Sequence, residues 1–248
     1  MDGSDPNARL NQIATLWTVV RLANNDAGEA GRQARAALLE RYDGAIRRYL
    51  VGVLRDPAAA QDLAQEFAYR FLHGDLKGAD RERGRFRDFV KGVLFHLVAD
   101  YHNRRKRQPG QLPEKVPEPA DECSLAAERD EAFRVSWRDE LLARTWKALQ
   151  TQEEHTGQLY YTVLRFRADH PDLNSTTMAE RLSEQLGKPL NAPAVRKTLE
   201  RARDRFAELL LDEIGQAIEN PSREALEDEL SELGLLEHCR SALAARGG

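Results

Sequence analysis

The sequence predicts an all-α protein with two helical domains, and three observations support this prediction. Leu and Ala each occur 33 times in the 248 residues, whereas Ile and Val occur only 4 and 11 times. Leu and Ala favour helices, and β-branched residues favour strands. Apolar residues recur at helical spacing in several segments, and a stretch with four prolines at 108–124 separates them into two groups. Because each proline removes a backbone donor, we expect this stretch to be a flexible linker.

The first domain is expected at 31–107, after an N-terminal extension at 1–30. Helices are expected at about 32–54 and 57–73, and a third is expected to begin near Phe86. The third segment has apolar residues at i, i+3, i+4, i+7, i+8, i+11, i+12 and i+15, which is typical of an amphipathic helix. This helix is expected to continue into the basic run that ends at Arg107.

The second domain is expected at 125–212, followed by an acidic C-terminal extension at 213–248. Its first helices are expected near 125–150 and 155–168, with a break at Pro171. The later helices are expected to begin after capping residues, which accept hydrogen bonds from the first backbone amides. They are a helix capped by Ser175, a helix capped by Asn191 with Pro193 in its first turn, and a last helix from about Ser222 to Leu243.

Several function classes are disfavoured by what the sequence lacks. No apolar run is long enough to predict a membrane span, and the start MDGSDPNARLNQ does not have the pattern of a secretory signal. The two cysteines form neither a disulfide framework nor a paired metal motif, so a cytoplasmic protein is expected. No phosphate-binding loop, nucleophile elbow or metal-ligand spacing is present. We therefore expect a protein that is not an enzyme and needs no cofactor or metal.

The charge is unevenly distributed, and its most basic segment is 80–107. Nine basic and four acidic residues give this segment a balance of +5 in a chain of net charge −4. Such a segment is suited to nucleic-acid phosphates, although a charged run is also typical of a solvated helix face. Within it, Arg87, Lys91 and Phe95 are spaced by four. Phe95 is expected either to stack on an unpaired base or to pack on a neighbouring helix.

Residues 175–207 have the pattern of a helix, a short turn containing Gly187, and a second helix. In a helix-turn-helix the second helix enters the major groove, where Arg and Lys contact guanine or phosphate. The second helix here carries Arg196, Lys197 and Arg201. Many helical hairpins share this pattern, but the basic second helix favours DNA binding.

The stretch 208–237 has ten acidic residues and one basic residue. Two interpretations are open. It is either an ordinary amphipathic segment with Leu226, Leu230 and Leu233 facing inward, or a cover that competes with DNA for a basic surface. In the second case, deleting the residues after Glu219 would tighten DNA binding.

Three motifs in this order resemble a bacterial RNA polymerase sigma factor of the sigma-70 family, in its extracytoplasmic-function group. Asp62–Phe67 (DLAQEF) is similar to the family's region 2 helix that meets the polymerase. Arg83–Phe89 (RGRFRDF), continued to Asp100 and the Arg/Lys cluster, is similar to the part that melts the promoter. Asn191–Arg196 (NAPAVR) is similar to the region 4 recognition helix. Together with the short opening LWTVV and the acidic tail, the second motif resembles a planctomycete-type subgroup.

The resemblance implies a role for individual residues and names the partners, which are core RNA polymerase and promoter DNA. Polymerase binding is implied for Asp62, Leu63, Gln65 and Glu66. Contact with the minus-ten region is implied for Arg83, Arg85, Arg87, Lys91, Phe95, His96, Asn103, Arg104 and Arg105. Contact with the minus-thirty-five duplex is implied for Asn191, Ala194, Arg196, Lys197, Arg201 and Arg203.

An anti-sigma protein or a regulatory kinase is a further partner that the resemblance allows, and no membrane contact is expected. Two alternatives remain open at the level of the sequence. One is a stand-alone helix-turn-helix regulator that binds duplex DNA without polymerase. The other is a helical adaptor that binds proteins only.

Overall fold

The computed structural model describes residues 23, 28–73, 85–107, 122–218 and 221–246. Within these ranges all regular structure is helical, which confirms the predicted all-α class. The chain separates into two compact units: unit 1 contains 1–140 with 216–220, and unit 2 contains 141–215 with 221–248. Most of the expected N-terminal extension and the expected linker, up to residue 121, lie outside the described residues.

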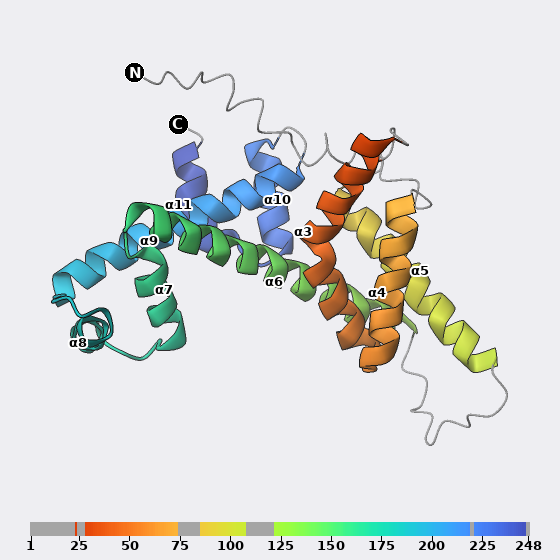
Figure 1. Cartoon of the computed structure of the whole chain (residues 1–248), viewed down its shortest axis with the longest axis horizontal. Helices are drawn as coiled ribbons and strands as arrows, with labels where there is room; N and C mark the ends of the chain where they lie inside the picture. The colour runs from red at the N-terminus through yellow and green to blue at the C-terminus, as the bar shows by residue number, and fades with distance from the viewer. Residues whose placement is uncertain (1–22, 24–27, 74–84, 108–121, 219–220, 247–248) are drawn as a thin grey trace. The chain divides into compact units, whose positions relative to one another are not determined.

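Among the described residues, unit 1 contains α3 (Glu29–Leu54), α4 (Pro57–His73) and α5 (Phe86–Arg107), close to their expected bounds (Figure 1). α3 ends at Arg55, whose φ of 53° places it in the left-handed region. The carboxylate of Asp56 then accepts hydrogen bonds from the amides of Ala58 and Ala59, both at 3.1 Å. Pro57 stands in the first turn of α4, where its missing N–H costs little.

An aromatic core holds unit 1 together and includes the first part of α6 (Glu122–Thr156). Trp137 of α6 is stacked on Tyr42 of α3 with ring centroids 4.5 Å apart, and Phe133 meets Tyr49 edge-on at 5.6 Å. Phe86 of α5 joins the same core 5.3 Å from Tyr42. All five side chains are buried.

The first part of α6 therefore packs in unit 1, whereas residues 125–140 were expected in the second domain. An ion pair between Arg48 of α3 and Glu140 at 2.5 Å lies in the same unit. Helical periodicity identifies the apolar face of a segment but not the element that covers it. The helix also begins at Glu122, three residues inside the expected linker.

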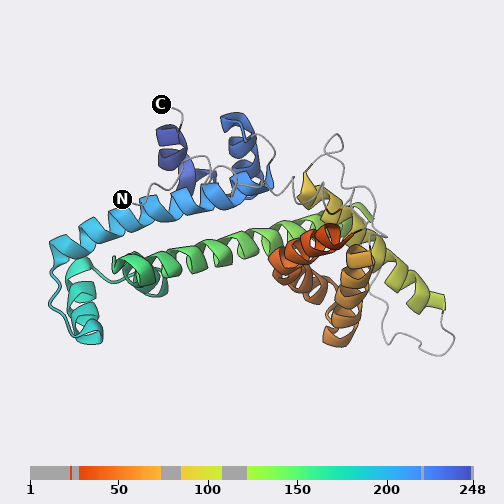
Figure 2. The same cartoon turned by 45° about the horizontal axis from the view of Figure 1, so that its top comes forward.

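Unit 2 contains the second part of α6, then α7 (Tyr160–Asp169), α8 (Ser175–Leu186) and α9 (Ala192–Ala217). Two short helices, α10 (Arg223–Glu232) and α11 (Leu236–Arg246), follow and lie beside α9 (Figure 2). The single last helix expected from Ser222 to Leu243 is thus two helices. Gly234 has a φ of +68°, a conformation that glycine adopts without steric cost, and it turns the chain between them.

The acidic extension packs with its apolar side inward, as the first of the two interpretations expected. Leu226, Leu230 and Leu233 are buried, while most of its carboxylates are exposed. Arg246 of α11 donates to the carbonyl of Glu208 at 3.0 Å and pairs with Asp212 at 2.6 Å, and both acceptors belong to the C-terminal half of α9. The extension thus completes the core of unit 2.

Deleting the residues after Glu219 is expected to destabilise unit 2, because it removes the buried side chains of Leu226, Leu230 and Leu233 and uncovers α9 near Gly215, which Leu226 approaches. Losing one buried leucine side chain costs about 2–5 kcal/mol, so the truncated chain should melt well below the full chain. Thermal denaturation followed by circular dichroism measures this. An unchanged melting temperature, together with tighter DNA binding at matched salt, would instead support the covering role.

Cys239 of α11 is fully buried, and burial raises the pKa of its thiol from the usual 9.0 to about 11. Because the thiolate is the nucleophile, we expect Cys239 to resist alkylation at pH 8 in the folded chain and to react on unfolding. The neutral thiol stabilises the folded state below pH 9, and this contribution is lost as the pH rises from about 9 toward 11. Mass spectrometry after iodoacetamide treatment of a Cys123→Ser variant measures the reaction; rapid alkylation without denaturant would contradict the burial.

Candidate nucleic-acid interface

The helix–turn–helix α8–α9 is held by hydrogen bonds at each end of its turn. Gly187 ends α8 with a φ of +62°. The hydroxyl of Ser183 accepts from the amide of Leu190 at 2.8 Å, which ties the turn back to α8. Asn191 caps α9 as expected, because its side chain accepts from the amide of Ala194 at 2.9 Å. The cap of α8 is Asn174 and not Ser175: its side-chain oxygen accepts from the amides of Thr176 and Thr177.

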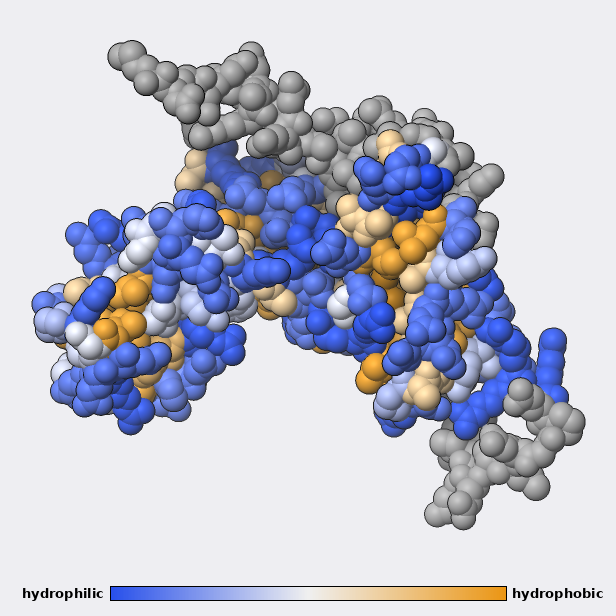
Figure 3. All heavy atoms as spheres, viewed as in Figure 1, coloured by the Kyte–Doolittle hydropathy of each residue, from blue (hydrophilic) through white to orange (hydrophobic). Residues whose placement is uncertain are grey.

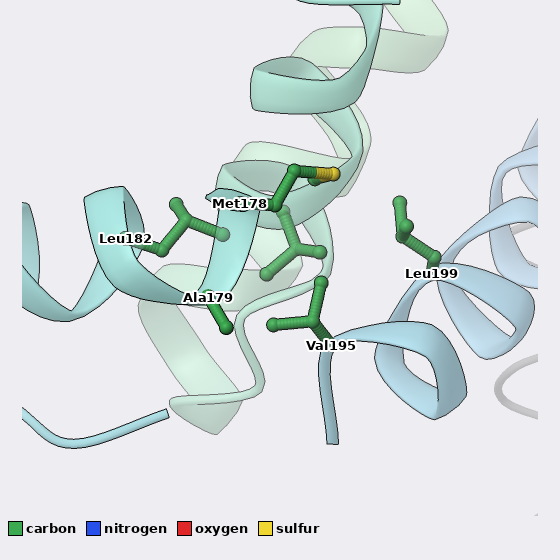
Figure 4. Close-up of a cluster of buried hydrophobic side chains, with 6 residues drawn as sticks. Met178, Ala179, Leu182, Val195 and Leu199 are labelled. Carbon is green, nitrogen blue, oxygen red and sulfur yellow. The ribbon is translucent and has the colours of Figure 1, made fainter. Parts of the chain in front are cut away.

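Apolar side chains fix the second helix on the first. Met178, Ala179 and Leu182 of α8 point toward Val195 and Leu199 of α9 (Figure 4). All of these are buried, and Val163 of α7 completes the cluster. This packing determines which face of α9 is exposed to solvent.

The outer face of α9 carries the basic residues that the sequence analysis selected. Arg196, Lys197, Arg201 and Arg203 are all exposed, as is Ala194. Glu200 and Asp204 are also exposed on this helix, so its exposed surface carries these four cationic side chains and two carboxylates. Among the described residues none of the four cations forms an ion pair. On the visible surface of Figure 3, hydrophilic side chains predominate and apolar ones gather in small groups.

Phe95 packs inside unit 1, as the second interpretation of its spacing expected. Its ring is stacked on that of Tyr49 with centroids 5.9 Å apart, and the ammonium of Lys91 lies 5.9 Å from its centre. Burial raises the pKa of the Tyr49 hydroxyl, so this group is neutral. Lys91 also pairs with Asp130 of α6 at 3.3 Å. Phe95 is half-buried, and Tyr49 and Lys91 cover part of its ring.

The remaining residues selected from the sequence in α5 and just before it differ in exposure. Arg85 and Arg87 are partly buried, and the side chain of Arg87 is only 10% exposed, whereas His96 is exposed. Arg83 lies outside the described residues. Arg85 and Arg87 are thus less accessible to a nucleic acid than the charge pattern of 80–107 suggested.

The C-terminal end of α5 is the accessible basic part of this helix. Asn103, Arg104 and Arg105 are exposed, and the guanidinium of Arg105 donates to the Tyr101 hydroxyl at 3.3 Å. A hollow of about 230 Å³ lies between the ends of α4 and α5. It is lined by Arg70, Asp100, Asn103, Arg104 and Arg107.

The predicted polymerase-binding residues on α4 differ in their exposure to solvent. Asp62 and Gln65 are exposed, whereas Leu63 is only 4% exposed and packs in the core. Leu63 therefore positions α4 and offers no surface to a partner. Glu66 is half-buried and pairs with two arginines, Arg70 of its own helix and Arg104 of α5.

Three residues of the hollow, Arg70, Asp100 and Arg107, were not predicted as site residues from the sequence. Arg70 stands four residues after Glu66, a spacing that by itself predicts an ion pair on a helix. Arg107 belongs to the basic cluster at the end of α5 but was not selected. Their convergence on one hollow depends on how α4 packs on α5, which no local pattern reveals.

In the part of the chain that the structure describes, no group of three or more His, Cys, Asp or Glu side chains could hold a metal ion. None of the described helices has both the length and the apolarity to cross a membrane. No family model matches this chain, and neither the curated proteins nor the solved structures contain a significant match to it.

Proposed function

We propose that the chain is a sigma factor of the extracytoplasmic-function group: a cytoplasmic protein, without enzymatic activity of its own, that directs core RNA polymerase to promoters. The observation that supports this most is the exposed basic face of α9, presented by a buried α8–α9 core. A basic second helix on a rigid turn is the arrangement that enters the major groove. In this proposal unit 2 reads the minus-thirty-five element.

Unit 1 supplies the other two functions in this proposal. Asp62 and Gln65 give α4 an acidic and polar surface for the polymerase. His96 and Asn103–Arg105 are the exposed groups on α5 that would meet the separated strand. Opening duplex DNA costs about 1.4 kcal/mol per base-pair step, so the protein must offset this with phosphate neutralisation and base contacts.

A stand-alone helix-turn-helix regulator is the second candidate, because the exposed basic face of α9 would suit duplex DNA without any polymerase. This alternative leaves the basic segment 80–107 without a role and assigns no partner to the exposed surface of α4. A regulator would bind duplex DNA tightly by itself, whereas a sigma factor needs core polymerase to act.

Run-off transcription with bacterial core RNA polymerase tests the proposal. Discrete transcripts should appear when the chain is added to a pool of promoter DNA. They should fall with Asp62→Lys and persist with Asp43→Lys, which changes an acidic residue of α3 that pairs with Arg47. Tight duplex binding without any effect on core polymerase would favour the regulator, and neither binding nor transcripts would favour a protein adaptor.

A further inference from the structure

A groove of about 560 Å³ lies between the second part of α6 and the C-terminal half of α9, and all of its lining belongs to unit 2. The two helices run beside each other in this part of the chain (Figure 2). The rings of Trp146 and Phe206 meet between them with centroids 4.7 Å apart, and this bulky pair keeps the two backbones apart. Pockets for small ligands have volumes of about 300–1,000 Å³, so the groove has room for one.

Two polar bridges cross the groove from one helix to the other. Arg144 of α6 donates from Nε to the carboxylate of Glu213 of α9 at 3.0 Å. Arg205 of α9 donates from Nε to the side-chain oxygen of Gln152 of α6 at 2.6 Å. On each helix the bridging residues are eight positions apart, which corresponds to about 12 Å along the helix axis. The bridges therefore delimit a stretch of groove about as long as a nucleoside with its phosphates.

The lining combines an apolar stretch with an excess of positive charge. Ala148 of α6 and Leu209 of α9 line the groove halfway between the two bridges. The lining also has three permanently charged cations, one carboxylate and one histidine, which are Arg144, Lys147, Arg205, Glu213 and His155. This excess of cations occurs in a chain whose net charge is −4, so the groove favours an anionic ligand.

Lys147 is the most available cation of the groove. It is exposed, and among the described residues it forms no ion pair, whereas Arg144 and Arg205 each pair with a glutamate. Thr151 follows one turn later on the same face of α6 and adds a hydroxyl donor. Ammonium and guanidinium N–H groups bind phosphate oxygens strongly, and an apolar surface binds the face of a base.

We propose that this groove binds a nucleoside phosphate, with the base on Ala148 and Leu209 and the phosphates on Lys147, Thr151 and Arg205. The bound nucleotide contacts both helices and so strengthens the attachment of α9 to α6. None of the residues proposed to contact DNA or polymerase lines the groove. The inference therefore goes beyond the proposed function and does not depend on it.

Isothermal titration calorimetry on the full chain tests the site, with ADP and GDP titrated separately. At least one of the two nucleotides should bind saturably, with one molecule per chain. The parent nucleoside and inorganic pyrophosphate each supply only one half of the contacts. Each should therefore bind at least about tenfold more weakly than the nucleotide.

Two substitutions address the two halves of the site. Lys147→Gln should weaken nucleotide binding about tenfold, the effect of losing one charged hydrogen bond. Its control is Lys188→Gln, which removes the same charge from an exposed position in the turn after α8. Ala148→Met fills the middle of the groove without changing its charge and should abolish binding. Its control is Ala143→Met, at an exposed position of α6 outside the lining.

The nucleotide site would be overturned if neither nucleotide bound at millimolar concentration, or if the two controls lost binding as much as Lys147→Gln and Ala148→Met. Pyrophosphate that bound as tightly as the nucleotide would show a site for free phosphate anions only. Duplex DNA that displaced the nucleotide, and that bound Lys147→Gln more weakly by the same factor, would show a contact for the DNA backbone instead. Thermal melts of each variant verify the fold.

Discussion

Replacing Arg196 and Lys197 together by Ala is expected to abolish promoter-directed transcription without unfolding the protein. Both side chains are exposed on α9, whereas the α8–α9 core is made by Val195, Leu199 and their partners. A side chain that contacts a base is worth about 1–3 kcal/mol, so losing two should weaken promoter use by at least about 30-fold. Run-off transcription and duplex binding by anisotropy measure the effect.

A matched control removes two cations from elsewhere in unit 2. Arg223 and Arg240 are exposed and lie on α10 and α11, where each pairs with a glutamate of its own helix. Replacing both by Ala lowers the net charge by the same amount and should leave transcription near the wild-type level. Equal losses in the two double variants would mean that only the net charge matters, and no loss in either would favour a protein adaptor.

Replacing Trp137 by Ala is expected to cause the largest loss of stability among single changes in unit 1. Trp137 is 2% exposed and is stacked on Tyr42 at 4.5 Å and on Phe133 at 5.7 Å. Truncating a buried tryptophan typically costs about 3–5 kcal/mol. Hydrogen exchange should speed up in α3 and α5, because their aromatic residues pack against Trp137 or its neighbours.

Leu182→Ala is the counterpart in unit 2, because Leu182 is fully buried in the α8–α9 core. It should speed up exchange in α8 and α9. If Trp137→Ala instead loosened α8 and α9 and spared α3 and α5, residues 125–140 would belong functionally to the second domain, as the sequence alone suggested. Denaturation curves of both variants give the free energies of unfolding.

The sequence by itself determined the class of structure and most helix positions. Three local signals were sufficient: the excess of Leu and Ala, the apolar spacing in 86–101 and the capping side chain of Asn191. Each of them favours helix formation through residues that are close in the sequence. The outward face of α9 could also be read from the sequence, because the apolar residues that bury its other side recur at helical spacing.

Only the tertiary structure decided what each face meets. Phe95 was a candidate for base contact by its spacing, and Leu63 was a candidate for polymerase contact by the family resemblance, yet one is stacked on Tyr49 and the other lies in the core. The pairing of Glu66 with Arg104, and the hollow that Arg70 and Arg107 share, join helices separated by dozens of residues in the chain. Burial and ion pairing depend on which helices pack together. The spacing of apolar residues within one helix does not identify the helix that packs against it.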